Sequence, residues 1–199
     1  MQELKDKVSY AVGLSIAESL KSQQLGSLDL NFLKDGIQDV FEQKELKINP
    51  EEANGLIQAF LEEANTAAFG ENKEQGIAFL EENKKKEGIL STESGLQYEI
   101  IEEGKGDKAG ATDTVTVHYH GTLIDGAVFD SSTERGTPAS FGVNQVIPGW
   151  TEALQLMSVG AKYRLYIPQE LAYGANPHPG GPIKPYSALI FDVELIEIK

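Results

Sequence analysis

The sequence contains no cysteine. This absence excludes disulfide bonds, catalysis by a thiolate and the cysteine-rich sites that commonly hold structural zinc. Long apolar runs are absent as well, because no segment approaches the roughly 20 consecutive apolar residues that a membrane-spanning helix needs. The sequence therefore predicts neither a disulfide framework nor an integral membrane protein.

The amino-terminal segment lacks the apolar core of a signal peptide. Its first 25 residues are interrupted by charges that include Glu3, Lys5, Asp6, Glu18 and Lys21. We therefore expect a cytoplasmic protein. The alternative is a periplasmic protein whose signal sequence has been removed.

Positive charge is also scarce. Against 31 acidic residues the chain has 17 Lys and Arg residues, so its formal net charge is −14. Nucleic acids and anionic lipid surfaces bind clustered Lys and Arg, because these residues displace the counterions of phosphate groups. The charge balance therefore predicts no nucleic-acid partner and no membrane-surface partner.

Proline is nearly missing from the first half of the chain. Only Pro50 occurs before Gly88, and the other seven prolines follow. In this half the apolar residues recur at helical spacing, and Asp29 suits the N-cap of the second helix. The two periodic series are Leu4, Val8, Val12, Ile16, Leu20 and Leu30, Leu33, Ile37, Val40, Phe41.

A third helix is predicted to begin at the segment NPEE. Asn49 suits its N-cap, Pro50 its first position and Glu52 its third position. Helix-compatible residues continue to about Glu87, which gives a length of about 55 Å at about 1.5 Å per residue. Gly70 and Gly76 each weaken this helix by about 1 kcal/mol relative to alanine and are candidates for a bend.

So long a helix has too little sequence beside it to cover its apolar face. We therefore expect residues 1–66 to form an intertwined homodimer, with residues 67–90 continuing the long helix as a linker. The alternative is a self-contained three-helix bundle.

The second half changes to the period of two that is typical of half-buried strands. PGWTEALQLM, residues 148–157, is its one convincing helix, with Trp150, Leu154 and Met157 on one side. One short helix against a mainly antiparallel sheet predicts an α+β domain of about 110 residues. The alternating residues are Leu96, Tyr98, Ile100; Val115, Val117, Tyr119; Tyr163, Leu165, Ile167; and Leu189, Phe191, Val193, Leu195.

Motifs for covalent or metal chemistry are weak. The glycine spacing of GKGDKAG, residues 104–110, fits no phosphate-binding loop, so we expect a turn between strands. His118 and His120 form a His-x-His pair on the strand face opposite Tyr119, and we expect no metal there. Asp130, its following serines and the distant His178 lack a nucleophile elbow, so a hydrolase triad is not predicted.

Four segments, in order, resemble the signatures of FKBP-type peptidyl-prolyl isomerases: VHYHGTLIDGAVFDSS, VIPGW, IPQELAYG and LIFDVELI. The match covers residues 91–199, and YAVGL and FLEENKKKEG in the helical half resemble the two-domain, Mip-like bacterial branch. The resemblance implies an all-helical dimerisation domain and linker helix. It further implies, over residues 91–199, a half-open antiparallel sheet wrapped around a short helix.

The resemblance also implies the site residues, without a metal or cofactor. In the family's pattern the pocket has Trp150 as its floor, and Tyr173 meets a substrate carbonyl. Ala139 departs from the pattern, since many members have an aromatic residue there. The implied catalytic residues are Tyr119, Phe129, Asp130 and Tyr173, and the implied substrate-binding residues are Arg135, Phe141, Val146, Ile147, Trp150, His178, Ile183 and Phe191.

Residues 169–185, QELAYGANPHPGGPIKP, are expected to form a stiff flap over this pocket, because prolines restrict backbone angles while glycines permit tight turns. The alternative is a solvent loop without a function. We expect a prolyl isomerase that acts on proline-containing polypeptides and binds macrolide inhibitors. The competing hypotheses are a chaperone clamp in which isomerisation is incidental, and a macrolide-binding domain without useful turnover.

Overall fold

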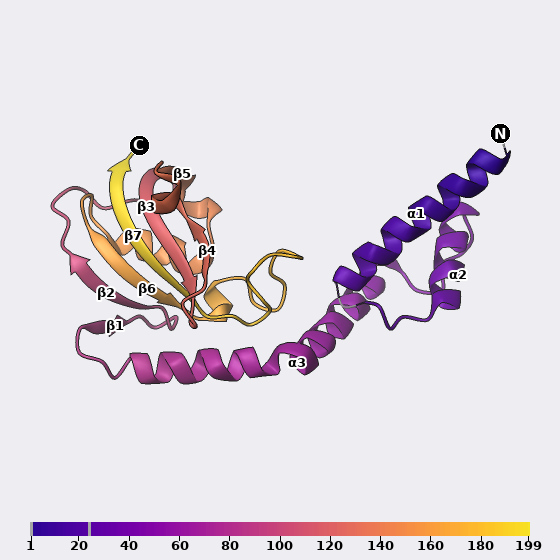
Figure 1. Ribbon diagram of the computed structural model, residues 1–199, viewed down its shortest axis with the longest axis horizontal. Helices are drawn as coiled ribbons and strands as arrows, with labels where there is room; N and C mark the ends of the chain where they lie inside the picture. Colours follow the sequence, from indigo (N-terminus) through magenta and orange to yellow (C-terminus); the bar gives the residue numbers. More distant parts are fainter. Residues whose placement is uncertain (1, 24) are drawn as a thin grey trace. The chain divides into compact units, whose positions relative to one another are not determined.

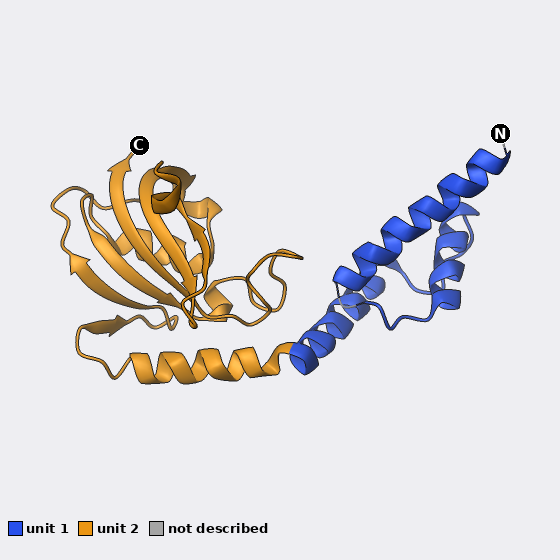
Figure 2. Cartoon of the chain, viewed as in Figure 1, with its two compact units in different colours: residues 1–68 blue, residues 69–199 orange. Residues whose placement is uncertain are grey.

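A computed structural model describes residues 2–23 and 25–199. The chain divides into two compact units, residues 1–68 and residues 69–199, which Figure 2 distinguishes by colour. The divisions expected from the sequence fall after residues 66 and 90, whereas in the structure the second half of the long linker helix belongs to the same unit as the sheet. None of the described helices combines the length and apolarity of a membrane span.

Unit 1 is helical. It contains α1 (Gln2–Ser22), α2 (Leu30–Phe41) and the first part of α3 (Pro50–Asn83). Both predicted caps are confirmed: the Asp29 carboxylate accepts hydrogen bonds from the backbone of Asn31 and Phe32, and the Asn49 side chain accepts one from the backbone of Glu52. These bonds satisfy backbone donors that have no partner in the first helical turn.

The apolar stripes of unit 1 are largely exposed within a single chain. Leu25 is the one buried hydrophobic residue among the described residues of this unit. Leu30 and Phe41 are 75% and 83% exposed. A helical unit whose apolar stripes covered one another would bury these side chains.

Helix α3 has a kink at Phe69, whose backbone angles are not helical (φ −129°, ψ 15°). The helix ends at Asn83, a few residues before the predicted end near Glu87. The Asn83 side chain is buried against the sheet, and Gly88 then takes a left-handed conformation (φ 86°) that turns the chain into the first strand. The lysines that suggested a longer helix therefore lie in this turn.

The sheet of unit 2 has seven strands, and every pairing is antiparallel. Its order is β1-β2-β6-β7-β3-β4, and β5 also pairs with β3 (Figure 1). The strands are β1 (Ile89–Ser91), β2 (Gln97–Glu102), β3 (Thr114–Leu123), β4 (Val128–Ser131), β5 (Ala139–Gly142), β6 (Lys162–Ile167) and β7 (Leu189–Ile198). The predicted α+β class is confirmed.

Helix α5 (Pro148–Leu156) packs on one face of the sheet, with the short helix α4 (Ser132–Arg135) after β4. Single 3₁₀ turns, η1 (Val143–Gln145) and η2 (Gln169–Leu171), precede α5 and follow β6. Trp150, Leu154 and Met157 all join the core, as predicted. The strand residues that share this core are Val115, Val117, Tyr119, Tyr163, Leu165, Ile167, Leu189, Phe191, Val193 and Leu195.

Gly149 permits the close packing of α5 on the sheet. A Cβ atom at this position would lie 2.5 Å from Cγ2 of Ile167, closer than two carbon atoms can approach. The first turn of α5, which carries Trp150, can therefore lie directly on β6.

We expect Gly149→Ala to lower the free energy of unfolding by about 1 to 3 kcal/mol, because the methyl group overpacks Ile167. The matched control is Gly70→Ala, where nothing lies within 4 Å of the added Cβ and alanine should stabilise the helix by up to about 1 kcal/mol. Urea unfolding, followed by near-ultraviolet circular dichroism, measures both. Equal effects of the two substitutions would contradict the close contact.

Candidate active site

A cavity of about 590 Å³ opens between α5, the strands around β3 and the flap. Its lining is mainly aromatic and branched apolar side chains, with one carboxylate, one amide and two tyrosine hydroxyls. The lining residues are Tyr119, Phe129, Asp130, Phe141, Gln145, Val146, Ile147, Trp150, Tyr173, Pro182, Ile183 and Phe191.

Trp150, in the first turn of α5, lies against three of the other lining rings. Its ring meets those of Tyr119, Phe141 and Phe191 edge to face, with centroids 5.4, 5.9 and 5.2 Å apart. Such tilted pairs place the positive edge of one ring on the negative face of another. The Trp150 indole nitrogen is buried and has no hydrogen-bond partner among the described residues. The cavity therefore has a fixed apolar surface with one unused donor.

Gly121 of β3 brings two further rings together. Phe129 and Phe191 meet edge to face with centroids 5.2 Å apart. A Cβ atom at Gly121 would lie 2.7 Å from the Phe129 ring and 2.8 Å from the Phe191 ring. Glycine at this position therefore lets both rings line the cavity.

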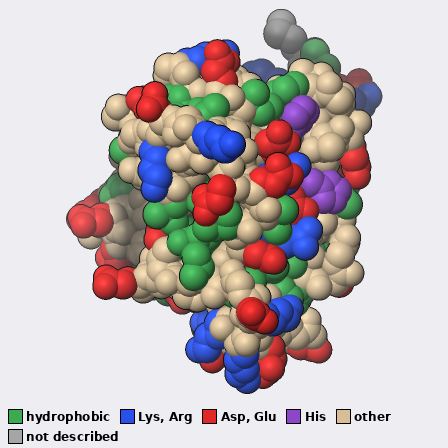
Figure 3. Space-filling model, turned by 90° about the vertical axis from the view of Figure 1, so that its left-hand side faces the viewer, with side chains coloured by type: hydrophobic (Ala, Val, Ile, Leu, Met, Phe, Trp, Pro, Cys, Tyr) green, Lys and Arg blue, Asp and Glu red, His purple; other side chains and the backbone are tan. Residues whose placement is uncertain are grey.

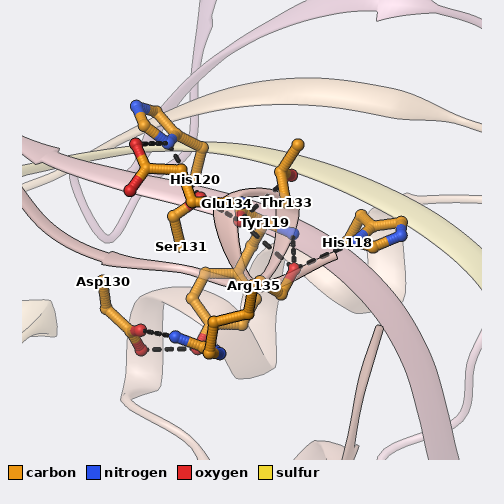
Figure 4. Close-up of polar contacts among 9 residues, drawn as sticks. His118, Tyr119, His120, Asp130, Ser131, Thr133, Glu134 and Arg135 are labelled. Atoms are coloured by element: carbon orange, nitrogen blue, oxygen red, sulfur yellow. Dashed lines mark hydrogen bonds and ion pairs between the residues drawn. The ribbon is translucent and has the colours of Figure 1, made fainter. Parts of the chain in front are cut away.

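Polar groups at the cavity form a network of Tyr119, Asp130 and Arg135 (Figure 4). The Tyr119 hydroxyl donates a hydrogen bond to Oδ2 of Asp130 at 2.5 Å, and Nη2 of Arg135 donates to the same hydroxyl at 2.8 Å. Arg135 also forms an ion pair with Oδ1 of Asp130, and its guanidinium lies over the Tyr119 ring. All three side chains therefore restrain one another.

The short helix α4 positions Arg135 in this network. Ser131 caps its start by accepting a hydrogen bond from the backbone of Glu134 at 3.1 Å, and Gly136 ends it in a left-handed conformation. The buried Ser132 hydroxyl accepts a 2.7 Å hydrogen bond from the backbone of Tyr119. The Ser132 hydroxyl thus ties β3 to the junction of β4, which carries Asp130, and α4, which carries Arg135.

The His118 and His120 side chains, on the strand face opposite Tyr119, contact these serines. Nδ1 of His118 lies 3.1 Å from the Ser132 hydroxyl, and Nδ1 of His120 lies 3.0 Å from the Ser131 hydroxyl (Figure 4). Glu134 lies 3.9 Å from His120. These histidines therefore pack beside the polar network instead of pointing into the cavity.

Acidic and basic side chains lie next to one another over the face of the molecule drawn in Figure 3. Among the ion pairs of the sheet, Arg164 of β6 donates two hydrogen bonds to Asp192 of β7 at 2.6 and 2.8 Å. Paired charges of this kind neutralise one another locally.

The environment shifts the ionisation of the cavity's polar groups. Burial alone would raise the pKa of Asp130, but the hydrogen bonds from Tyr119 and Arg135 outweigh it and hold the pKa below its usual value. Burial raises the pKa of Tyr119, and the hydrogen bond to Asp130 adds to this effect. Burial also raises the pKa of Tyr173. At neutral pH the cavity therefore contains one carboxylate and two neutral phenols.

A backbone hydrogen bond between the flap and the residue after it closes the flap. Gly174, with φ 56°, accepts a 2.8 Å hydrogen bond from the backbone nitrogen of Tyr186, the residue that follows the flap. Tyr173 directly precedes Gly174 in the chain, while Pro182 and Ile183 reach the cavity from the carboxy-terminal part of the flap. One short loop therefore contributes three lining residues.

Ten of the twelve residues expected from the sequence line this cavity. Arg135 instead contacts two of them, Asp130 and Tyr119, and His178 is not among the lining residues although it lies in the flap. Gln145 and Pro182 also line the cavity and were not among the twelve expected residues. Gln145 directly precedes the segment VIPGW, and Pro182 lies within the expected flap, directly before Ile183, so these positions are the signal that could have found them.

A half-open antiparallel sheet around one short helix, with an aromatic cavity between them, is the architecture expected of prolyl isomerases of the FKBP class. Residues 105–196 match the family model described as FKBP-type peptidyl-prolyl cis-trans isomerase, and residues 5–100 match the model of the domain amino terminal to it. The chain belongs to the FKBP-type peptidyl-prolyl cis-trans isomerase family, in the branch with this amino-terminal domain.

Relatives cover the whole chain. The FKBP-type 22 kDa peptidyl-prolyl cis-trans isomerase of Escherichia coli is 46% identical over 98% of this chain and 96% of its own length. A Legionella longbeachae protein named outer membrane protein MIP is also 46% identical, over 98% and 86%. The crystal structure of FkpA from Escherichia coli covers 100% of this chain and 96% of its own, with a TM-score of 0.65 and 38% identity.

We expect Asp130→Asn to lower the turnover of a proline peptide by about tenfold, because asparagine keeps the shape but loses the charge that faces the cavity. A loss of turnover beyond about a thousandfold would instead indicate obligatory acid-base chemistry.

Wild-type activity should change less than about threefold between about pH 5 and 9, since the lowered pKa keeps Asp130 ionised throughout. The stability that this carboxylate contributes is present above its unfolded pKa and is lost as the pH falls through the lowered native pKa.

Proposed function

We propose that the chain accelerates rotation about X-Pro bonds by holding the prolyl amide in the aromatic cavity, without covalent or proton-transfer chemistry. The single observation that carries this proposal is the packing of Trp150 beneath Tyr119, Phe141 and Phe191. Amide resonance sets a rotation barrier of about 18 to 20 kcal/mol. The planar amide is the more charge-separated state, so an environment that replaces water favours the twisted state.

The proposed roles follow from where each side chain lies. Trp150 forms the floor, Phe129 and the neighbouring rings form walls, and Val146 and Ile147 form the edge at the start of α5. Tyr173 donates its hydroxyl hydrogen to a substrate carbonyl, a donation that its raised pKa preserves at neutral pH. Acceleration by a factor of about a million would require about 8 kcal/mol of preferential stabilisation of the twisted state.

Macrolides of the immunophilin-binding class are proposed as competitive ligands of the same cavity. Its volume of about 590 Å³ falls within the range of about 300 to 1,000 Å³ that is typical of small-molecule sites.

The compartment proposed for the chain is the periplasm, the alternative left open by the sequence. A relative with 46% identity is named an outer membrane protein, which supports this proposal over a cytoplasmic location.

A homodimer through residues 1–66 is the proposed assembly. The exposed apolar side chains of α1 and α2 support it, since Val8, Val12 and Ile37 are all more than one-third exposed in the single chain. An apolar groove of about 390 Å³ runs between α1 and α2, lined in part by Ile16 and Leu33. A second copy would remove these surfaces from water.

A chaperone clamp is the second candidate function, and the same exposed helices favour it. Two catalytic cavities on one dimer raise the effective concentration of the second cavity for a client that reaches both. Slow-folding proteins would then be better substrates than short peptides.

Tyr173→Phe tests the proposed mechanism. We expect this change to lower kcat for a proline peptide by about tenfold with little change in KM, because the hydroxyl acts mainly on the twisted state. A protease-free isomerisation assay measures both constants, with a macrolide as the inhibitor. Tyr10→Phe is the matched control, because Tyr10 is exposed on α1. An unchanged rate in Tyr173→Phe would favour a flap without a catalytic role.

Removal of unit 1 separates the enzyme from the clamp. Among the described residues, every buried hydrophobic side chain except Leu25 lies within residues 69–199, so this fragment should fold by itself. We expect it to be monomeric in light scattering and to keep activity on a proline tetrapeptide, but to lose activity on a protein whose refolding is limited by proline isomerisation. Parallel retention of both activities would contradict the clamp.

A further inference from the structure

The second half of α3 is packed onto the sheet of unit 2 (Figure 2). Near its end the buried side chains of Asn83 and Gln97 form a 3.0 Å hydrogen bond, and Gln97 donates a second one to the backbone oxygen of Leu80 at 2.9 Å. Phe79 meets Tyr166 of β6 with ring centroids 6.1 Å apart. This part of the helix is thereby fixed to strands β2 and β6.

One to three turns earlier, α3 contacts the end of the flap and the exit segment, residues 186–188. Nδ2 of Asn72 donates a 3.3 Å hydrogen bond to the backbone oxygen of Pro185, the last residue of the flap. The Lys73 ammonium lies 5.5 Å from the centre of the Tyr186 ring. A Cβ atom on the buried Gly76 would lie 3.3 Å from Cβ of Ala188. Glycine at this position therefore permits a very close approach of the helix to the exit segment.

The exit segment holds the flap closed in a backbone conformation that needs support. Tyr186 is a buried, non-glycine residue with φ 62°, and its backbone nitrogen makes the hydrogen bond to Gly174 that closes the flap. Such conformations persist where the surrounding structure fixes them. Asn72 and Lys73 of α3 contact Pro185 and Tyr186, and these contacts support the conformation from one side.

We propose that Asn72 and Gly76 of α3 are positioning residues for catalysis, which act through the exit segment on the flap residues at the cavity. Tyr186 connects the two: it packs at α3, and its hydrogen bond to Gly174 fixes the residue next to Tyr173. The inference rests on the proposed role of Tyr173 and assigns catalytic importance to a helix that contributes no residue to the cavity lining.

The test compares Gly76→Leu with Gly70→Leu in the full chain. Both place the same side chain on the same helix, but nothing lies within 4 Å of a Cβ atom at Gly70. We expect Gly76→Leu to lower kcat for a proline tetrapeptide by about tenfold, more than it raises KM, because small displacements of a positioned group reduce turnover. Amide hydrogen exchange at Tyr186 should accelerate in this variant. Gly70→Leu should stay within about twofold of the wild type in both measurements.

Two further variants keep the test decisive if Gly76→Leu fails to fold. Asn72→Ala removes the hydrogen bond to Pro185 without adding bulk, and it should accelerate Tyr186 exchange and lower kcat in the same direction. Gly76→Ala should lower kcat, and adding Ala188→Gly should restore it, because the second substitution removes the Cβ atom that the new methyl group would contact.

Wild-type kcat in Asn72→Ala and in a folded Gly76→Leu would overturn the inference, and so would a Gly76→Ala defect that Ala188→Gly leaves unchanged. An inactive wild-type chain would overturn the proposed function instead. In that case faster exchange at Tyr186 in the α3 variants supports the contact between α3 and the flap, and unchanged exchange overturns it.

Discussion

The packing of α5 against the concave side of the sheet is the constraint on which the rest of unit 2 depends. Gly149 brings the first turn of the helix onto Ile167, and this approach sets the depth at which Trp150 lies. The rings of Tyr119 and Phe191, from two central strands, then contact the indole edge to face. Core and cavity thus share the same side chains, so any change that loosens the core also reshapes the cavity.

A carboxylate beside this aromatic surface needs compensation, because a low-dielectric environment disfavours charge. Tyr119 and Arg135 supply it through direct hydrogen bonds to the Asp130 carboxylate, and α4 holds Arg135 in place. These hydrogen bonds therefore keep Asp130 ionised beside the aromatic rings at neutral pH. This arrangement agrees with the proposed mechanism, in which the prolyl amide rotates and no proton is transferred.

Much of this architecture could be predicted because it repeats along the sequence. Alternation at Val115, Val117 and Tyr119 revealed the buried face of β3, and Asn49 with Pro50 marked the start of α3. The cavity residues came from ordered motifs that resemble a family, since no periodicity distinguishes a pocket ring from a core ring.

Single long-range polar contacts leave no such pattern. The buried pair of Asn83 and Gln97, which accompanies the end of α3, joins two polar residues that individually look exposed. His178 lies in the flap but is not among the residues that line the cavity, and a loop rich in proline and glycine does not specify in its sequence which side chains turn inward. The single tryptophan of the chain lies in the cavity floor. Its emission spectrum is therefore an intrinsic optical reporter of occupancy, free of background from any other indole, and a bound ligand can be titrated without a label.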